Sequence, residues 1–162
     1  MMKKLIIING TMGVGKTLTS KLLYKSLDKS VCLDGDWCWM MNPFKVTEEN
    51  KKMVEDNIIY LLNNFLKNSS FKYVIFNWVI HKEYIFDIIL DKLTEDFELY
   101  KISLTCSKDE LRKRILKDNR KEEVITKSIE RLKNYEDMST IKIDTTDKLP
   151  KEVVKEIIDI VN

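Results

Sequence analysis

The stretch GTMGVGKT, from Gly10 to Thr17, combines glycines with a lysine and a threonine at a spacing that suits phosphate binding. It matches the pattern G-x-x-x-x-G-K-[ST] in full. Its glycines let the backbone turn tightly, so that successive amide N–H groups can point at phosphate oxygens in front of a helix N-terminus. Lys16 would reach the β- and γ-phosphates as a point charge, and the Thr17 hydroxyl would be one ligand of a bridging Mg²⁺. This chemistry is typical of a nucleoside triphosphate site.

The surroundings of the motif support this interpretation. It follows the apolar run Leu5–Asn9 and precedes the amphipathic stretch Lys16–Leu27, which is the strand–loop–helix context that the motif requires. The alternative is an ordinary glycine-rich turn, but such a turn has no need for lysine and threonine at these two positions. The predicted nucleotide-binding residues of this segment are Gly10, Thr11, Met12, Gly13, Val14, Gly15, Lys16, Thr17 and Leu18.

Two carboxylates follow the next apolar run, in the stretch VCLDGDWCW. Asp34 and Asp36 should lie at the carboxyl end of a second strand, the edge of an open α/β sheet where ligands bind. We expect Gly35 between them to allow an unusual backbone angle. We assign Asp34 to an acceptor hydroxyl and Asp36, together with Thr17, to the metal, and the reverse assignment stays open. The alternative is that DGD is only a turn.

The third apolar run, YVIFNWV, lacks a carboxylate at its end. A GTPase or an AAA-type ATPase would be expected to carry an Asp there to hold Mg²⁺. This chain has Asn77 at that position. The carboxylates at the end of the second run therefore become the better candidates for metal and acceptor chemistry.

Short β-rich runs alternate with stretches of helical period along the chain. The runs are too apolar on both faces for an open antiparallel sheet, so they predict parallel strands with helices on each side. Helix starts are marked by Thr47, by a capping box over Ser107–Glu110 and by Pro150. The resulting pattern is βαβαβαβααβα in one domain over residues 1–162. The predicted strands are Leu5–Asn9, Val31–Asp34, Tyr73–Asn77, Leu99–Leu104 and Ile141–Asp144.

Composition fits one globular domain of 162 residues, of which 44% are apolar and 33% are charged. The net charge of +2 does not indicate a nucleic-acid partner. Three cysteines without a Cys-x-x-Cys pair, and His81 as the single histidine, indicate a reducing compartment and argue against structural zinc. The apolar run after MMKK is too short for a signal peptide or a membrane span, so we expect a cytoplasmic protein, monomeric or homodimeric, without a membrane partner.

Taken together, the motifs resemble the small P-loop kinases of the nucleoside-monophosphate-kinase-like superfamily, which includes shikimate, gluconate and adenylylsulfate kinases and chloramphenicol phosphotransferase. GTMGVGKT is similar to their phosphate loop, LDGD at Leu33–Asp36 to the segment after their second strand, and LRKRILKDNR at Leu111–Arg120 to their lid. The resemblance implies a P-loop NTPase fold, a three-layer α/β/α sandwich with a five-stranded parallel sheet in the order 2-3-1-4-5. It also implies ATP with Mg²⁺, a lid around residues 107–125, and a loop at Ile143–Lys148 beside the adenine.

Arginines in the predicted lid supply the positive charge that phosphoryl transfer demands. We place Arg114 near the nucleotide base or phosphates and Arg120 near the γ-phosphate. A solvated helix face rich in opposite charges is the alternative. The predicted catalytic residues are therefore Lys16, Asp34, Asp36, Arg114 and Arg120.

The acceptor is predicted from where the arginines lie. All four of them, Arg112, Arg114, Arg120 and Arg131, follow residue 111, whereas kinases of anionic acceptors are expected to place arginines in the acceptor-binding half. This chain instead has WCWMMNPF over residues 37–44, then Trp78 and His81. These side chains favour a flat or apolar, largely uncharged small-molecule acceptor. The alternatives are core or lid-covering positions for Trp37 and Trp39, and a surface or capping position for His81.

The sequence thus predicts an ATP- and Mg²⁺-dependent kinase that transfers the γ-phosphoryl group to a hydroxyl. Lysines 45, 51, 52 and 82 could still bind an anion, which leaves a nucleotide kinase open. A nucleotide-binding regulatory module without catalysis is the alternative from another class of protein.

Overall fold

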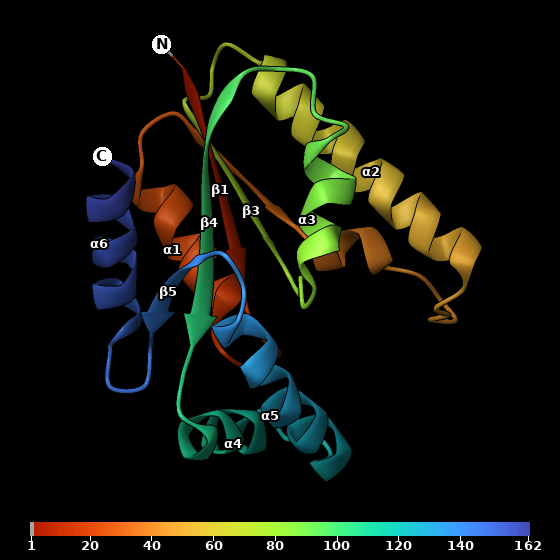
Figure 1. Cartoon of the computed structure of the whole chain (residues 1–162), viewed down its shortest axis with the longest axis vertical. Helices are drawn as coiled ribbons and strands as arrows, with labels where there is room; N and C mark the ends of the chain where they lie inside the picture. The colour runs from red at the N-terminus through yellow and green to blue at the C-terminus, as the bar shows by residue number, and fades with distance from the viewer. Residues whose placement is uncertain (1) are drawn as a thin grey trace.

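The computed structural model describes residues 2–162, and its strands form one five-stranded sheet in the order β2-β3-β1-β4-β5 (Figure 1). All four strand pairs are parallel. The predicted fold class and strand order are therefore confirmed, and each strand lies within two residues of its predicted bounds. The strands are β1 (Lys3–Asn9), β2 (Ser30–Asp34), β3 (Tyr73–Trp78), β4 (Phe97–Thr105) and β5 (Ile141–Asp144).

Helices connect the strands and follow the predicted βαβαβαβααβα pattern, with one addition. A short 3₁₀-helix, η1 (Gly35–Trp39), directly follows β2 and contains the predicted DGD turn. In residues 2–162 the α-helices are α1 (Lys16–Ser26), α2 (Glu48–Lys67), α3 (Glu83–Leu90), α4 (Lys108–Lys117), α5 (Glu122–Glu136) and α6 (Pro150–Val161).

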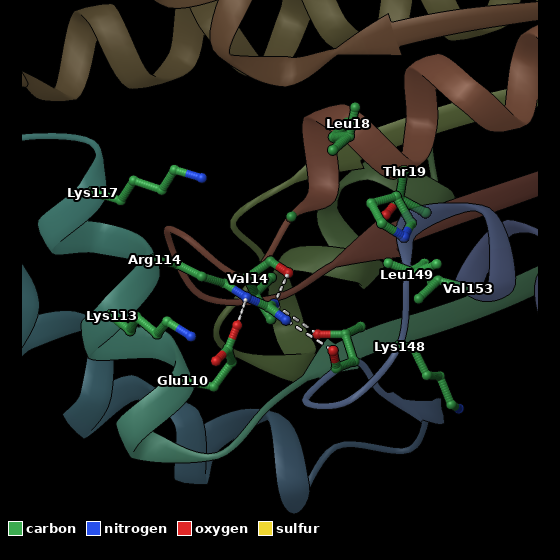
Figure 2. A pocket seen from close by; sticks show the side chains of 13 residues that line it. Val14, Leu18, Thr19, Glu110, Lys113, Arg114, Lys117, Lys148, Leu149 and Val153 are labelled. Atoms are coloured by element: carbon green, nitrogen blue, oxygen red, sulfur yellow. Dashed lines mark hydrogen bonds and ion pairs between the residues drawn. The ribbon is translucent and has the colours of Figure 1, made fainter.

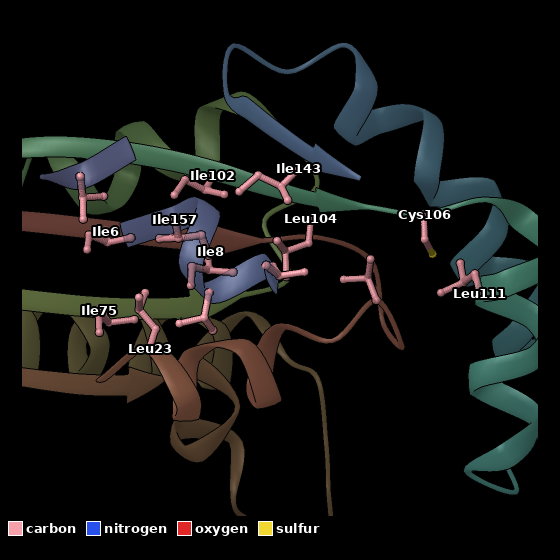
Figure 3. Close-up of a cluster of buried hydrophobic side chains, with 14 of the residues drawn as sticks. Ile6, Ile8, Leu23, Ile75, Ile102, Leu104, Cys106, Leu111, Ile143 and Ile157 are labelled. Carbon is pink, nitrogen blue, oxygen red and sulfur yellow. The ribbon is translucent and has the colours of Figure 1, made fainter. Parts of the chain in front are cut away.

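Alternating side chains of β1 divide the core into two layers. Ile6 and Ile8 pack with α1 and α6 on one face, in the cluster that Figure 3 shows. Leu5 and Ile7 pack with α2 and α3 on the other face. Because β1 is covered on both sides, all four side chains are fully buried. Helices α4 and α5 lie beyond the carboxyl ends of the strands, where they can cover a site on that edge (Figure 1).

The edge strand β5 departs from the prediction that every strand is covered on both faces. Ile141 is 41% exposed, and Ile143 is the buried residue of this strand. No helix among residues 2–162 has the length and apolar character needed to cross a lipid bilayer.

Two predicted helix starts are confirmed and one differs. The Thr47 hydroxyl accepts a hydrogen bond from Asn50 N–H (3.1 Å), and Pro150 occupies the first turn of α6. At α4, the Ser107 hydroxyl accepts from Glu110 N–H (3.2 Å), but the return bond of the predicted capping box is absent. The Ser107 N–H instead donates to the Thr146 hydroxyl (2.9 Å), and the Glu110 carboxylate accepts from Arg114 (2.8 Å).

Candidate active site

The phosphate loop joins the end of β1 to the start of α1. Its three glycines have positive φ, and Gly15, the N-cap of α1, has φ 109° and ψ 18°. A Cβ on Gly15 would have no atom within 4 Å, so the backbone conformation, and not crowding, favours glycine here. The first turn of α1 contains no acidic residue. The loop therefore presents open backbone and a helix N-terminus, which together suit an anion.

Lys16 is a buried cation at the base of this loop. Its Nζ donates a hydrogen bond to the Thr11 carbonyl (3.0 Å), and among residues 2–162 it has no ion pair. Burial lowers the pKa of Lys16 to about 8, against the opposing charges of Asp36 and Asp34. A buried ammonium group without a counterion is unfavourable unless an anion binds beside it. These features fit the phosphates of ATP.

Thr17 and Asp34, two predicted site residues from different elements, lie within hydrogen-bond distance of each other. The Thr17 hydroxyl donates to Asp34 Oδ2 (3.1 Å), and Asp34 Oδ1 accepts from the Asp36 N–H (3.0 Å) as the N-cap of η1. Hydroxyl and carboxylate oxygens are suitable Mg²⁺ ligands. Mg²⁺ is usually held by one or two protein ligands together with nucleotide phosphates and water, so the pair Thr17 and Asp34 fits this ion.

Asp36 lies at the first turn of η1 with its side chain exposed at a cavity. Partial desolvation of its carboxyl group and the neighbouring Asp34 charge raise the pKa of Asp36, while Lys16 and Arg120 act in the opposite direction. A carboxylate with a raised pKa is a better proton acceptor near neutral pH than an ordinary aspartate.

Gly35 holds the two aspartates in place for a different reason from the predicted one. The expected unusual backbone angle is wrong, because the glycines with positive φ in residues 2–162 are Gly10, Gly13 and Gly15. Gly35 is buried against Trp78, and a Cβ added to it would lie 2.6 Å from two atoms of the indole ring. Close packing of Trp78 therefore requires glycine between the carboxylates.

A cavity of about 480 Å³ lies between the phosphate loop, α4 and the loop after β5 (Figure 2). Arg114 spans it. Its guanidinium donates to Glu110 (2.8 Å), to the Val14 carbonyl (3.2 Å), and to the hydroxyl and carbonyl of Thr145 (2.9 and 2.8 Å). Leu18 is 51% exposed and lines the same cavity. The nucleotide-binding roles of Arg114 and Leu18 stay predictions, and both residues line this cavity beside the phosphate loop.

Thr145 and Glu110 are two cavity residues that the sequence analysis did not select as site residues. The stretch IDTTDK was placed beside the adenine only as a loop, and the signal available for Thr145 was its position directly after the last strand. Glu110 was interpreted as a capping residue. Both orient Arg114 through hydrogen bonds, so they act on the cavity through this side chain.

Arg120 lies in the turn between α4 and α5, and its guanidinium contacts the Met12 sulfur atom of the phosphate loop. Its charge also lowers the pKa values of Lys16 and Asp36. Arg112 instead pairs with Glu122. The structure thus places Arg114 and Arg120 at the phosphate loop and Arg112 in a link between the two helices.

A second cavity, of about 510 Å³, opens beside Asp36. The rings of Trp39 and Phe44 lie in it with centroids 5.8 Å apart. Trp37 lines a different cavity with Thr17 and Asp34. The lining residues of the second cavity are Met12, Asp36, Trp39, Phe44, Trp78, Val79, His81 and Arg131.

Arg131 bears on the predicted acceptor. The absence of arginine from residues 1–111 led to the prediction of a largely uncharged acceptor, but Arg131, from the later part of the chain, lines the cavity beside Asp36. Helix α5 runs back toward the carboxyl edge of the sheet, which brings Arg131 to the same cavity as Asp36 (Figure 1). Lys51 and Lys52, considered as anion ligands, pair instead with Glu48 and Asp56.

The fold and the glycine-rich loop define a P-loop protein. Residues 6–140 match the sequence profile of the family described as AAA domain, and the chain belongs to this family. The matched region includes Asn77 near the end of β3, where an AAA-type ATPase was expected to have a metal-binding Asp. The chain belongs to the family without a carboxylate at this position. No curated protein matches the chain.

Solved structures of similar fold include small-molecule kinases. A Deinococcus radiodurans tunicamycin resistance protein is 18% identical with a TM-score of 0.80, over 99% of this chain and 96% of that chain. A gluconokinase from Sinorhizobium meliloti 1021 is 15% identical with a TM-score of 0.69, over 95% of this chain and 88% of that chain. A shikimate kinase from Aquifex aeolicus vf5 is 20% identical with a TM-score of 0.64, over 97% of this chain and 95% of that chain. These likenesses confirm the predicted resemblance to P-loop kinases at the level of the fold.

Proposed function

We propose that the protein is an ATP- and Mg²⁺-dependent kinase that transfers the γ-phosphoryl group to a hydroxyl of a small molecule. One observation carries the proposal: the phosphate loop contributes residues both to a cavity that contains Arg114 and to a cavity that contains the free carboxylate of Asp36. A protein that only binds or hydrolyses a nucleotide has no need for the second cavity. The fold shared with a gluconokinase and a shikimate kinase supports the same reaction class.

The two aspartates take the reverse of the roles first assigned to them. Asp34 is bonded to Thr17, so we assign Asp34 to the metal side. Asp36 lines the second cavity and has a raised pKa, so we assign Asp36 to the acceptor hydroxyl. Asp34 then lies beside Thr17, the other proposed metal ligand, and Asp36 lies in the cavity proposed for the acceptor.

Bound MgATP supplies the phosphoryl group and an electrophilic phosphorus atom. The acceptor oxygen bonds to this phosphorus, the bond to the bridging oxygen breaks, ADP leaves, and the hydroxyl proton moves to Asp36. Lys16 and Arg120 offset the negative charge that spreads over the transferred group. Arg114 orients the nucleotide from the base side.

The rings of Trp39, Phe44 and Trp78 suit a flat or apolar body on the acceptor. A wholly uncharged acceptor no longer follows from the arginine distribution, because Arg131 reaches this cavity. The nucleotide kinase and the non-catalytic module remain distinguishable from our proposal by experiment.

The test is release of ADP from MgATP in the presence of nucleosides, nucleoside monophosphates, sugars, hydroxylated acids and aminoglycoside- or phenicol-type antibiotics. We expect at least one hydroxyl compound to raise the rate by about 10²-fold or more over ATP alone, a gain within the range of general-base and positioning effects. Asp36→Asn should remove this stimulation. Stimulation by monophosphates alone would indicate a nucleotide kinase, and a rate insensitive to every compound would indicate a binding module.

A further inference from the structure

Arg131 brings an unpaired positive charge to the cavity beside Asp36. It is exposed on α5, and among the described residues 2–162 its guanidinium has no ion pair and no hydrogen bond. The arginines of α4 differ, because Arg112 pairs with Glu122 and Arg114 with Glu110. A guanidinium group at a cavity wall offers paired N–H donors that match the two oxygens of a carboxylate or phosphate.

His81 adds a neutral hydrogen-bonding group to the same cavity. Its Nδ1 is buried and has no hydrogen-bond partner in the described part of the chain. Desolvation, together with the charges of Arg131 and Lys82, lowers the pKa of His81, so the ring is neutral at neutral pH. Buried polar atoms are nearly always satisfied in functional states. His81 lines the cavity that also contains Arg131, so its imidazole can contact a ligand there.

We propose that Arg131 and His81 form a subsite for one anionic group of the acceptor, separate from the hydroxyl that Asp36 receives. This inference rests on the proposed function and narrows its substrate class. The acceptor has a hydroxyl for Asp36, a flat or apolar body for Trp39 and Trp78, and a carboxylate or phosphate for Arg131. The cavity wall contains a partner for each of these three groups.

Binding can be measured without turnover, because Trp39 and Trp78 line the cavity and report on it by fluorescence. The probes are two matched pairs, measured with MgADP present. The first pair is 3-(hydroxymethyl)benzoate and its neutral amide. The second pair is 3-(hydroxymethyl)phenyl phosphate and 3-methoxybenzyl alcohol, in which a methyl group replaces the phosphate. We expect one acid to bind at least about tenfold more tightly than its neutral partner, a difference of about 1.4 kcal/mol. The acid that shows this preference identifies the group as carboxylate or phosphate.

Three variants assign the preference to its residue. Arg131→Gln should abolish the acid preference and leave the affinity for MgADP unchanged. Lys133→Gln, which removes one charge from the same helix outside the cavity, should keep the preference. His81→Phe should weaken both members of a pair and keep the preference for the acid.

The inference is overturned if no acid shows saturable binding, if acid and neutral probes bind equally, or if Arg131→Gln keeps the preference. Loss of the preference in His81→Phe would also overturn the assignment of charge recognition to Arg131. None of these results affects acceptor-stimulated ADP release by neutral compounds. The kinase proposal is therefore tested separately, by acceptor-stimulated ADP release.

Discussion

Lys16 should stabilise bound phosphates and, in the nucleotide-free protein, lower the free energy of unfolding. The side chain is 8% exposed, and burial lowers its pKa from 10.5 to about 8. That shift corresponds to about 3 kcal/mol of unfavourable charge burial. Lys16→Met keeps the apolar stem but loses the hydrogen bond to the Thr11 carbonyl, which is worth about 1 kcal/mol. The Thr11 carbonyl still accepts from Val14 N–H (3.3 Å).

We therefore expect Lys16→Met to raise the free energy of unfolding by about 2 kcal/mol at pH 7 without nucleotide, while turnover falls by about 10²-fold or more. Below pH 8 lysine is charged in both the folded and the unfolded chain, so the full free-energy cost of burying the Lys16 charge applies. Between pH 8 and 10.5 the folded chain releases the proton first, and the penalty fades. The stability advantage of Lys16→Met should fade over the same range.

Urea unfolding at pH 7 and at pH 10 measures this difference. Lys21→Met is the matched control, because Lys21 is exposed on the same helix and should change stability by less than about 0.5 kcal/mol. MgATP should stabilise the original chain and Lys21→Met but not Lys16→Met. A Lys16→Met protein that is less stable than the original at pH 7, or an advantage that persists at pH 10, would refute the reasoning.

Three further perturbations test the rest of the site. Arg114→Ala removes the contacts to Glu110, Val14 and Thr145, so the half-saturating ATP concentration should rise about tenfold, whereas Arg112→Ala should change it less than about twofold. Gly35→Ala forces a Cβ to within 2.6 Å of Trp78 and should cost about 1–3 kcal/mol in urea unfolding, and an unchanged stability would count against this packing. Because the pKa of Asp36 is raised, the acid limb of kcat/KM should lie above about pH 3.9, and a limb at or below that value would contradict its role as base.

Contiguous motifs and periodicity were enough to predict the strands and helices, and the resemblance to P-loop kinases supplied the strand order. The phosphate loop is recognisable because all its chemistry lies within Gly10–Thr17, and β1 is recognisable because it is apolar on both faces. Both depend on local sequence, so they could be assigned without knowledge of tertiary contacts.

The details of the site depend on contacts between distant segments. Gly35 is required by the Trp78 ring, and Arg131 reaches the cavity beside Asp36 because α5 returns toward the sheet edge. The direction of the Asp34 side chain is set by its cap of η1 and its bond to Thr17. Spacing alone cannot determine side-chain direction, so the roles of Asp34 and Asp36 could not be separated from the sequence.

The most direct measurement follows an isotope-labelled γ-phosphate from ATP to its product, with the best acceptor from the ADP-release screen. The proposal predicts that the label appears in a phosphate monoester on the acceptor hydroxyl. In Asp36→Asn this transfer should fall by about 10²-fold or more with MgATP binding retained. In Asp34→Asn it should require a higher Mg²⁺ concentration. Label found only in inorganic phosphate with every acceptor, or full transfer by Asp36→Asn, would contradict the account.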